Sequence, residues 1–181
     1  MRLIGLLGLA GLSFGLTIYP IPVEVKGRVG YLYIEGQEGQ TFKITSEPFE
    51  EGEQDNLIVY PPQVRLRNGK SVIKVAFKNT DTSKEQAGRV VLTELKPQSE
   101  GLSIAYSFSV PVFQPPRKEV FEVEVECMKD RMVVKNKGNI HIKITSLDDK
   151  PVLHYVLPNK QIEVQRAKVI ETQRGKVNAC F

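Results

Sequence analysis

Apolar and polar positions alternate along most of the chain from Thr17 onward, which is the pattern of strands with one buried face. None of the apolar clusters repeats with the period of a helix. The clusters that we expect to form strands are TIYPIPVEV, VGYLYI, TFKIT, NLIVY, VIKVAF, RVVLTEL, LSIAYSFSVPVF, VFEVEVEC, RMVVK, NIHIKIT and VLHYVL. Turn residues separate them at about the interval of a β-sandwich, as at Asn68-Gly69 and Pro158-Asn159. The sequence therefore predicts an all-β protein.

The segment from Gln114 to Lys118 interrupts this pattern with two consecutive prolines. Proline removes a backbone donor and stiffens the chain, so we place a domain boundary here. Residues 16–115 have the size of an immunoglobulin-like sandwich, and residues 116–181 are short for the same architecture. We therefore expect two immunoglobulin-like β-sandwich domains in tandem, the second shortened.

Residues 1–15 have the composition of a secretory signal peptide. Met1-Arg2 supplies a short basic start, LIGLLGLAGLSFG is apolar, and Ser13 and Gly15 are small residues at the spacing that a signal peptidase requires. The alternative, a buried N-terminal helix, is disfavoured by the glycines within the segment. The apolar run is shorter than the ~18 residues that span a bilayer, so stable membrane insertion is not expected. We predict cleavage after Gly15 and export from the cytoplasm.

The chain contains two cysteines, Cys127 and Cys180, and thiols can pair outside the cytoplasm. Cys127 belongs to the first expected strand of the second domain and Cys180 to its end. A disulfide between them would contribute roughly 4 kcal/mol to a small domain by the loop-entropy estimate. Two unpaired thiols, or pairing between chains, are the alternatives.

Composition and charge exclude several classes of function. The chain is 41% apolar with a formal charge of +4, and its basic and acidic residues are interleaved, so no nucleic-acid-binding surface is indicated. No motif surrounds His141 or His154, and we interpret His141 as structural because it alternates with isoleucines in an expected strand. The histidines and cysteines are too few for a zinc site, and no glycine-rich phosphate loop is present. We expect a protein that is not an enzyme, with no cofactor and no metal.

The segment from Leu102 to Val112 has the longest regular alternation in the chain. Its apolar positions share one face of a strand: Leu102, Ile104, Tyr106, Phe108, Val110 and Val112. Pro111 cannot donate to a ladder, which favours a sheet edge or a bulge. A long edge strand with an apolar row either packs in its own sandwich or is added as a strand to another protein, and the pattern leaves both open.

Five motifs, in order, resemble those of periplasmic pilus (fimbrial) assembly chaperones of the chaperone-usher pathway. VYPPQVRLRNGKSVIKVAF at 59–77 is similar to a turn and strand of their first domain, and EQAGRVVLTELKP at 85–97 and YSFSVPVFQPP at 106–116 are similar to its last two strands, above all in the archaic branch. VVKNKGNIHIKIT at 133–145 and VLPNK at 156–160 resemble two loops of the second domain. The resemblance covers most of the chain after residue 15.

This resemblance implies a periplasmic chaperone that completes the open fold of a pilus subunit lacking its last strand and delivers it to an outer-membrane usher. The inserting residues would be Leu102, Ile104, Tyr106 and Phe108, with Val110 and Val112 in the chaperone's own core. Burial of four such side chains would contribute roughly 6 to 10 kcal/mol before ordering costs.

The sequence departs from that family at the residues that anchor the subunit. Better-studied members hold the subunit's terminal carboxylate with an arginine on the first strand and a lysine on the last. TIYPIPV and SFSVPVF contain no basic residue. Arg89 matches an arginine of the archaic members and is the candidate anchor, the alternative being an ordinary exposed strand residue. Gly88 stands where those relatives usually carry an aromatic residue.

Two other functions remain open from the sequence. One is a secreted adhesion or surface-interaction protein built on the same sandwiches, and the other is a chaperone relative that stabilises a different envelope protein. An adhesin would bind its ligand at the cell surface, whereas a chaperone would form a soluble one-to-one complex with an incomplete subunit.

Overall fold

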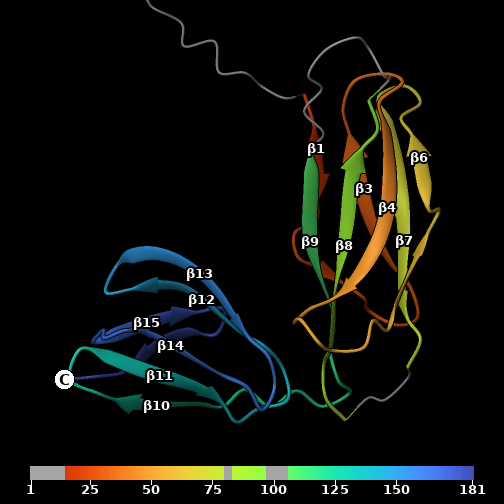
Figure 1. Ribbon diagram of the computed structural model, residues 1–181. Helices are drawn as coiled ribbons and strands as arrows, with labels where there is room; N and C mark the ends of the chain where they lie inside the picture. The colour runs from red at the N-terminus through yellow and green to blue at the C-terminus, as the bar shows by residue number, and fades with distance from the viewer. Residues whose placement is uncertain (1–14, 80–82, 97–105) are drawn as a thin grey trace, which may run out of the picture.

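The computed structural model describes residues 15–79, 83–96 and 106–181, and within them the chain forms strands and no helix. The all-β prediction is confirmed. Figure 1 shows two β-sandwiches joined at one end, so that the molecule is L-shaped. No apolar helix long enough to cross a membrane occurs among these described residues. The predicted signal peptide lies outside them, apart from Gly15.

Two facing sheets form the N-terminal sandwich. The first has the order β1 (Thr17–Tyr19), β3 (Gly30–Glu35), β7 (Lys70–Phe77) and β5 (Leu57–Tyr60). The second has the order β2 (Val23–Glu24), β9 (Ser107–Gln114), β8 (Gln86–Glu94), β4 (Thr41–Pro48) and β6 (Gln63–Arg65). Alternation of side chains buries one face of each sheet, as in β7, where Ile73 and Val75 are buried while Val72 and Lys74 are exposed.

The N-terminal end of the described chain crosses from one sheet of this sandwich to the other. β1 pairs antiparallel with β3, and after Pro20 and Pro22 the chain continues as β2, which pairs parallel with β9. This second pairing is short, because Val23 lies opposite Val112 and Glu24 opposite Phe113. The backbone N–H of Val25 extends it by donating to the carbonyl oxygen of Phe113 (2.8 Å).

The second sandwich is smaller. One sheet has the order β10 (Val123–Cys127), β11 (Arg131–Asn136) and β14 (Gln161–Gln165). The other has the order β13 (Lys150–Val156), β12 (Ile142–Leu147), β15 (Val169–Thr172) and β16 (Gly175–Asn178). A separate apolar core fills the space between them, with Met132, Ile142, Ile144 and Ile170 at 0% exposure.

Cys127 and Cys180 are joined by a disulfide in this sandwich, with Cα atoms 5.8 Å apart. Cys127 ends β10 and Cys180 follows β16, so the bond links the first strand of the sandwich to the end of the chain that packs on the other sheet. Closing a loop this long restricts the unfolded chain, which stabilises a sandwich with a small core.

Four strands were not expected from the sequence: β6, β14, β15 and β16. Each is five residues or shorter and carries few apolar residues; in β14, for example, only Val164 is buried. Their neighbours in the sheets hold them, which local alternation does not reveal. The expected turns are present, and Asn68 and Gly69 both take positive φ (53° and 69°) in the hairpin between β6 and β7.

Candidate functional site

β9 is paired fully on one side and only in part on the other. Its antiparallel ladder with β8 runs from Thr93 opposite Ser107 to Gln86 opposite Gln114. On the opposite side, β2 pairs only with the C-terminal end of β9. Within the described chain, no strand covers the outer edge of β9 from Ser107 to Pro111. This is an open edge, the feature that strand addition requires.

The proposed inserting residues lie along this edge and before it. Leu102 and Ile104 lie outside the described residues. Tyr106 directly precedes β9, half-buried, and its carbonyl oxygen accepts a hydrogen bond from the N–H of Glu94 (2.9 Å), which continues the ladder. Nζ of Lys96 lies 5.0 Å from the centre of the Tyr106 ring.

Phe108 is half-buried and packs against the first apolar core, on the same face as the fully buried Val110 and Val112. The apolar row therefore enters the protein's own core at Val110, and Phe108 lies at the margin. Its neighbours Ser107 and Ser109 on the opposite face are exposed.

Arg89 is on β8, opposite Pro111 of β9 on one side and Glu47 of β4 on the other. It is half-buried. Nε donates to the carbonyl oxygen of Phe49 (3.1 Å), and Cζ lies 4.2 Å from the centre of the Phe49 ring. No hydrogen bond or ion pair joins its two Nη atoms to any described residue, so both remain able to bind an external acceptor.

Phe49 belongs to an aromatic cluster that joins the two sandwiches. The members from the first sandwich are Phe49, Ala87 and Phe113, and those from the second are Tyr155 and Leu157. Ring centres lie 5.3 Å apart for Phe49 and Phe113, 5.5 Å for Phe113 and Tyr155, and 6.0 Å, edge to face, for Phe49 and Tyr155. Arg89 thus lies at the junction of the two domains.

Tyr155 brings a phenol from the second sandwich to the same junction. Burial raises the pKa of Tyr155, and the positive charge of Arg89 acts in the opposite direction. The hydroxyl has no hydrogen-bond partner among the described residues. Arg89 and Tyr155, which come from different domains, thus both pack on the ring of Phe49.

A buried carboxylate, that of Glu85, also ties the domains together. The backbone N–H of His141 donates to Oε1 of Glu85 (2.8 Å), and Nδ1 of His141 lies 2.9 Å from each carboxylate oxygen. The imidazole stacks on Phe113, with ring centres 4.0 Å apart. The N–H of Glu85 donates to the carbonyl oxygen of Asn139 (2.8 Å), and Nδ2 of Asn139 donates to the carbonyl oxygen of Ser83 (3.1 Å).

The turn that carries Asn139 is built by a second asparagine, Asn136, which is 1% exposed. Its Nδ2 donates to the carbonyl oxygens of Ile140 and Val156 (both 2.8 Å), and its Oδ1 accepts from the N–H of Gly138 (2.9 Å). A Cβ at Gly138 would lie 2.2 Å from the carbonyl oxygen of Val120, so this position requires glycine. The turn therefore fixes the segment that reaches the first domain.

Two cavities flank the aromatic cluster, and residues of both domains line each of them. One, of about 440 Å³, includes Glu85, Phe113, His141 and Lys143, and the other, of about 370 Å³, includes Glu85. Arg89 lines neither cavity. No group of three His, Cys, Asp or Glu side chains in the described part of the chain is placed to hold a metal ion.

The sequence alone indicated β9 and Arg89 but not the junction. Phe49, Glu85 and Tyr155 come from segments far apart in the chain, and Glu85 and His141 are 56 positions apart. The available signal for Asn136 and Asn139 was the motif at 133–145, in which both asparagines flank Gly138.

Comparison with known proteins gives a fold but no sequence family. Neither a protein-family model nor a curated protein sequence matches the chain. Among solved structures, the complex of the Salmonella enterica SafA pilin with the SafB chaperone matches with a TM-score of 0.71 and 15% identity, over 93% of this chain and 96% of that chain.

Two further chaperone structures are also similar to this chain. The Escherichia coli chaperone DraB matches with a TM-score of 0.71 and 15% identity, over 93% of this chain and 98% of that chain. The class 5 fimbriae chaperone CfaA matches with a TM-score of 0.62 and 18% identity, over 90% of this chain and 96% of that chain. This protein has the two-domain β-sandwich fold of pilus chaperones.

Proposed function

We propose that the protein is a periplasmic chaperone that binds an incomplete pilus subunit by adding β9 and the residues before it to the subunit's open sheet. The observation that carries the proposal is the outer edge of β9 from Ser107 to Pro111, which no strand of the described residues pairs, with Phe108 at its margin. Such an edge offers main-chain hydrogen bonds, and the alternating apolar residues that precede it offer side chains for the subunit's groove.

Leu102, Ile104, Tyr106 and Phe108 are the inserting residues in this proposal. Phe108 already packs on the first core. It would therefore mark the boundary between the part of the strand that packs in the chaperone and the part that inserts into the subunit. Val110 and Val112 are fully buried and anchor the strand in its own sandwich.

The junction of the two domains would hold the end of the subunit. Neither Nη atom of Arg89 bonds to a residue that the structure describes, and a guanidinium binds a carboxylate well. We propose Arg89 as the anchor for the subunit's terminal carboxylate and Tyr155 as a second donor beside it. Delivery to an outer-membrane usher, and export through the signal peptide of residues 1–15, complete the proposed function.

The first experiment identifies the client. A tagged form of the chain, expressed in its own cell envelope, is purified and the exported proteins bound to it are sequenced. We expect one subunit that lacks its last strand. Expression of that subunit with and without the chaperone, followed by measurement of soluble subunit, then tests donation.

Ile104→Asp and Phe108→Asp should each abolish accumulation of soluble subunit, because a charge does not enter an apolar groove. Ile58→Asp is the control, since Ile58 is an exposed apolar residue (48%) on β5, in the sheet that does not contain β9. Ile104→Asp keeps the test valid if Phe108→Asp disturbs the first core. Unchanged subunit yield with both variants would reject strand donation and favour an adhesion protein.

A further inference from the structure

The disulfide of the second sandwich joins two residues of different exposure. Cys127 is exposed at the end of β10, whereas Cys180 is 2% exposed and belongs to the second core. Sγ of Cys180 lies 3.9 Å from Sδ of Met132, and its backbone N–H donates to the carbonyl oxygen of Ala167 (3.0 Å). Cys127 is therefore the more exposed residue of the two, while Cys180 and Arg166 line a surface cavity on their own side of the bond.

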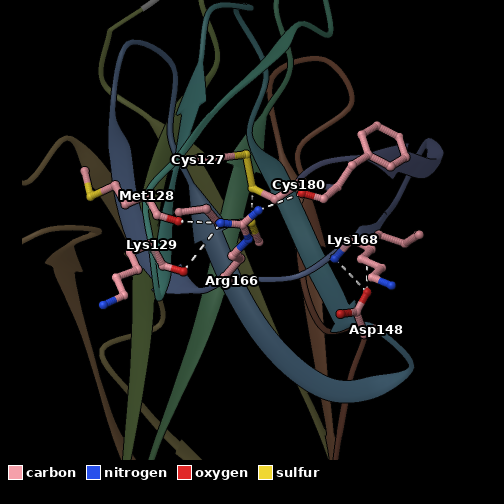
Figure 2. Close-up of a disulfide and its surroundings, with 10 residues drawn as sticks. Cys127, Met128, Lys129, Asp148, Arg166, Lys168 and Cys180 are labelled. Carbon is pink, nitrogen blue, oxygen red and sulfur yellow. Dashed lines mark hydrogen bonds between the residues drawn. A yellow bond between two sulfur atoms is a disulfide. The ribbon is translucent and has the colours of Figure 1, made fainter.

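A single side chain, that of Arg166, binds the residues that follow each cysteine. Nη1 donates to the carbonyl oxygens of Met128 (2.9 Å) and Lys129 (3.4 Å), which follow the first cysteine. Nη2 donates to the carbonyl oxygen of Phe181 (2.7 Å), which follows the second. Figure 2 shows the guanidinium next to the disulfide, between these two segments. All three acceptors are backbone atoms, so these contacts do not require the sulfur–sulfur bond.

The loop after Asp148 supports the same region from the other side. Oδ1 of Asp148 accepts hydrogen bonds from the N–H groups of Lys168 and Val169 (both 2.9 Å), as Figure 2 shows for Lys168. The segment that begins with Arg166 is therefore fixed at both ends, and its carbonyl group at Ala167 in turn binds Cys180.

We propose that Cys127 is the site at which this disulfide exchanges with external thiols and disulfides, and that Arg166 is the positioning residue that keeps Cys180 within reach of it. The external partner is a small thiol such as glutathione or the dithiol of a thiol–disulfide oxidoreductase. Because the bond links two residues 53 positions apart, its state sets the stability of the sandwich that carries Tyr155 and His141.

The exchange follows from ordinary thiol chemistry. In reduction, an external thiolate attacks Sγ of Cys127, a bond forms between these sulfurs, and Cys180 leaves as a thiolate that takes a proton from water. A second external thiolate then attacks the external sulfur and releases Cys127 together with an external disulfide.

In oxidation, the thiolate of Cys127 attacks an external disulfide, forms a mixed disulfide and releases one external thiolate. The thiolate of Cys180 then attacks Sγ of Cys127, forms the protein disulfide and releases the second external thiolate. One external disulfide thus becomes two thiols for each protein disulfide formed.

The order of attack is tested with the unaltered protein and glutathione. The folded, oxidised protein is treated briefly with reduced glutathione, quenched with acid, and digested, and the glutathione adduct is located by mass spectrometry. We expect the adduct on Cys127, in at least tenfold excess over Cys180. An adduct mainly on Cys180, or equal amounts on both, would overturn the assignment.

Single-cysteine variants give a second measurement. With oxidised glutathione under folding conditions, the Cys180→Ser variant should form a mixed disulfide at Cys127 at least ten times faster than the Cys127→Ser variant does at Cys180. Equal rates in two folded variants would contradict the proposal.

The role of Arg166 is tested by the equilibrium between the protein dithiol and glutathione redox buffers. The equilibrium constant gives the effective concentration of one protein thiol relative to the other. Arg166→Ala should lower this effective concentration several-fold, and Arg166→Lys should restore part of it. Arg131→Ala is the control, because Arg131 is an exposed arginine in an ion pair with Glu163 on the same sandwich. If Arg166→Ala leaves the effective concentration unchanged while lowering the stability of both redox forms equally, Arg166 has no positioning role.

Discussion

His141 meets the carboxylate of Glu85 through two of its atoms, the backbone N–H and Nδ1, across the junction of the two sandwiches. The Glu85 side chain is 3% exposed, so its oxygens depend on these donors rather than on water. The pair is therefore a buried polar contact between the domains, in addition to the aromatic cluster, the hydrogen bonds of Asn139 and the ion pairs of Lys160.

Glu85→Ala should consequently lower the free energy of unfolding by about 1–3 kcal/mol, since it leaves the donors of His141 without an acceptor. Glu85→Gln should cost less, because an amide oxygen can still accept from the backbone N–H. Glu163→Ala is the control: its ion pair with Arg131 is exposed, so the loss should be below about 1 kcal/mol. Urea denaturation measures all three, and equal losses for Glu85→Ala and Glu163→Ala would show that the buried polar contact contributes nothing.

Two buried glycines provide a matched pair of substitutions. At Gly138, a Cβ would lie 2.2 Å from the carbonyl oxygen of Val120 and 2.9 Å from the backbone nitrogen of Glu122, so the turn must shift. At Gly88, a Cβ would meet Leu57 at an ordinary 3.4 Å. Gly138→Ala should destabilise the protein by about 1–3 kcal/mol or more, and Gly88→Ala by much less.

Thermal unfolding followed by circular dichroism measures the difference. A similar midpoint for the two variants would contradict the close approach at Gly138. The contrast also bears on Gly88, where the resemblance to archaic chaperones leads one to expect an aromatic residue: the adjacent Leu57 fills this part of the core instead.

The edge strand β1 is attached to β3 by a pH-dependent contact between side chains. The Tyr19 hydroxyl donates to Oε1 of Glu35 (2.8 Å), and Lys70 forms an ion pair with the same carboxylate. The hydrogen bond from Tyr19, and then Lys70, lower the pKa of Glu35, while the bond to Glu35 raises the pKa of Tyr19.

The signs define the pH window. A lowered carboxyl pKa stabilises the folded state above the ordinary pKa of the group, and this is lost as the pH falls through the lowered value. A raised tyrosine pKa stabilises the folded state at pH values below the ordinary pKa of the group. That stabilisation is lost as the pH rises through the raised value. Attachment of β1 should therefore weaken at both acid and alkaline extremes.

Tyr19→Phe removes the donor, so the pKa of Glu35 should rise toward its ordinary value in an NMR titration of the carboxyl carbon. Tyr31→Phe, on β3 at a comparable exposure, is the control and should leave it unchanged. The same Glu35 titration curve in both variants would show that the hydrogen bond is absent in solution.

The sequence predicts the strands that alternate over six or more residues, because burial of one face is a local property of such strands. It predicts β3, β7 and β9 for this reason. The short strands β14 to β16 and the junction residues Phe49 and Tyr155 depend on contacts between distant segments, for which one sequence carries no local sign. Arg89 was found only through resemblance, and its place beside Tyr155 required the structure.

The last prediction concerns Arg89 at the junction of the two domains. Arg89→Ala should weaken binding of the subunit about 10- to 100-fold, the loss expected when a charged hydrogen bond worth about 1.5–3 kcal/mol is removed. Arg89→Met should weaken binding to the same extent, although it keeps an apolar side chain over Phe49. Lys43→Ala is the control and should have no effect, since Lys43 is an exposed cation on the neighbouring β4.

Competition between each variant and a tagged unaltered chaperone for the bound subunit measures the relative affinities, and a semisynthetic subunit with an amide in place of its terminal carboxylate completes the cycle. If Arg89 binds the carboxylate, Arg89→Ala should cost almost nothing further with the amide subunit, because the two changes remove the same interaction. Tyr155→Phe should show the same pattern with a smaller loss. Additive losses would place the carboxylate elsewhere and leave Arg89 as a residue that only packs on Phe49.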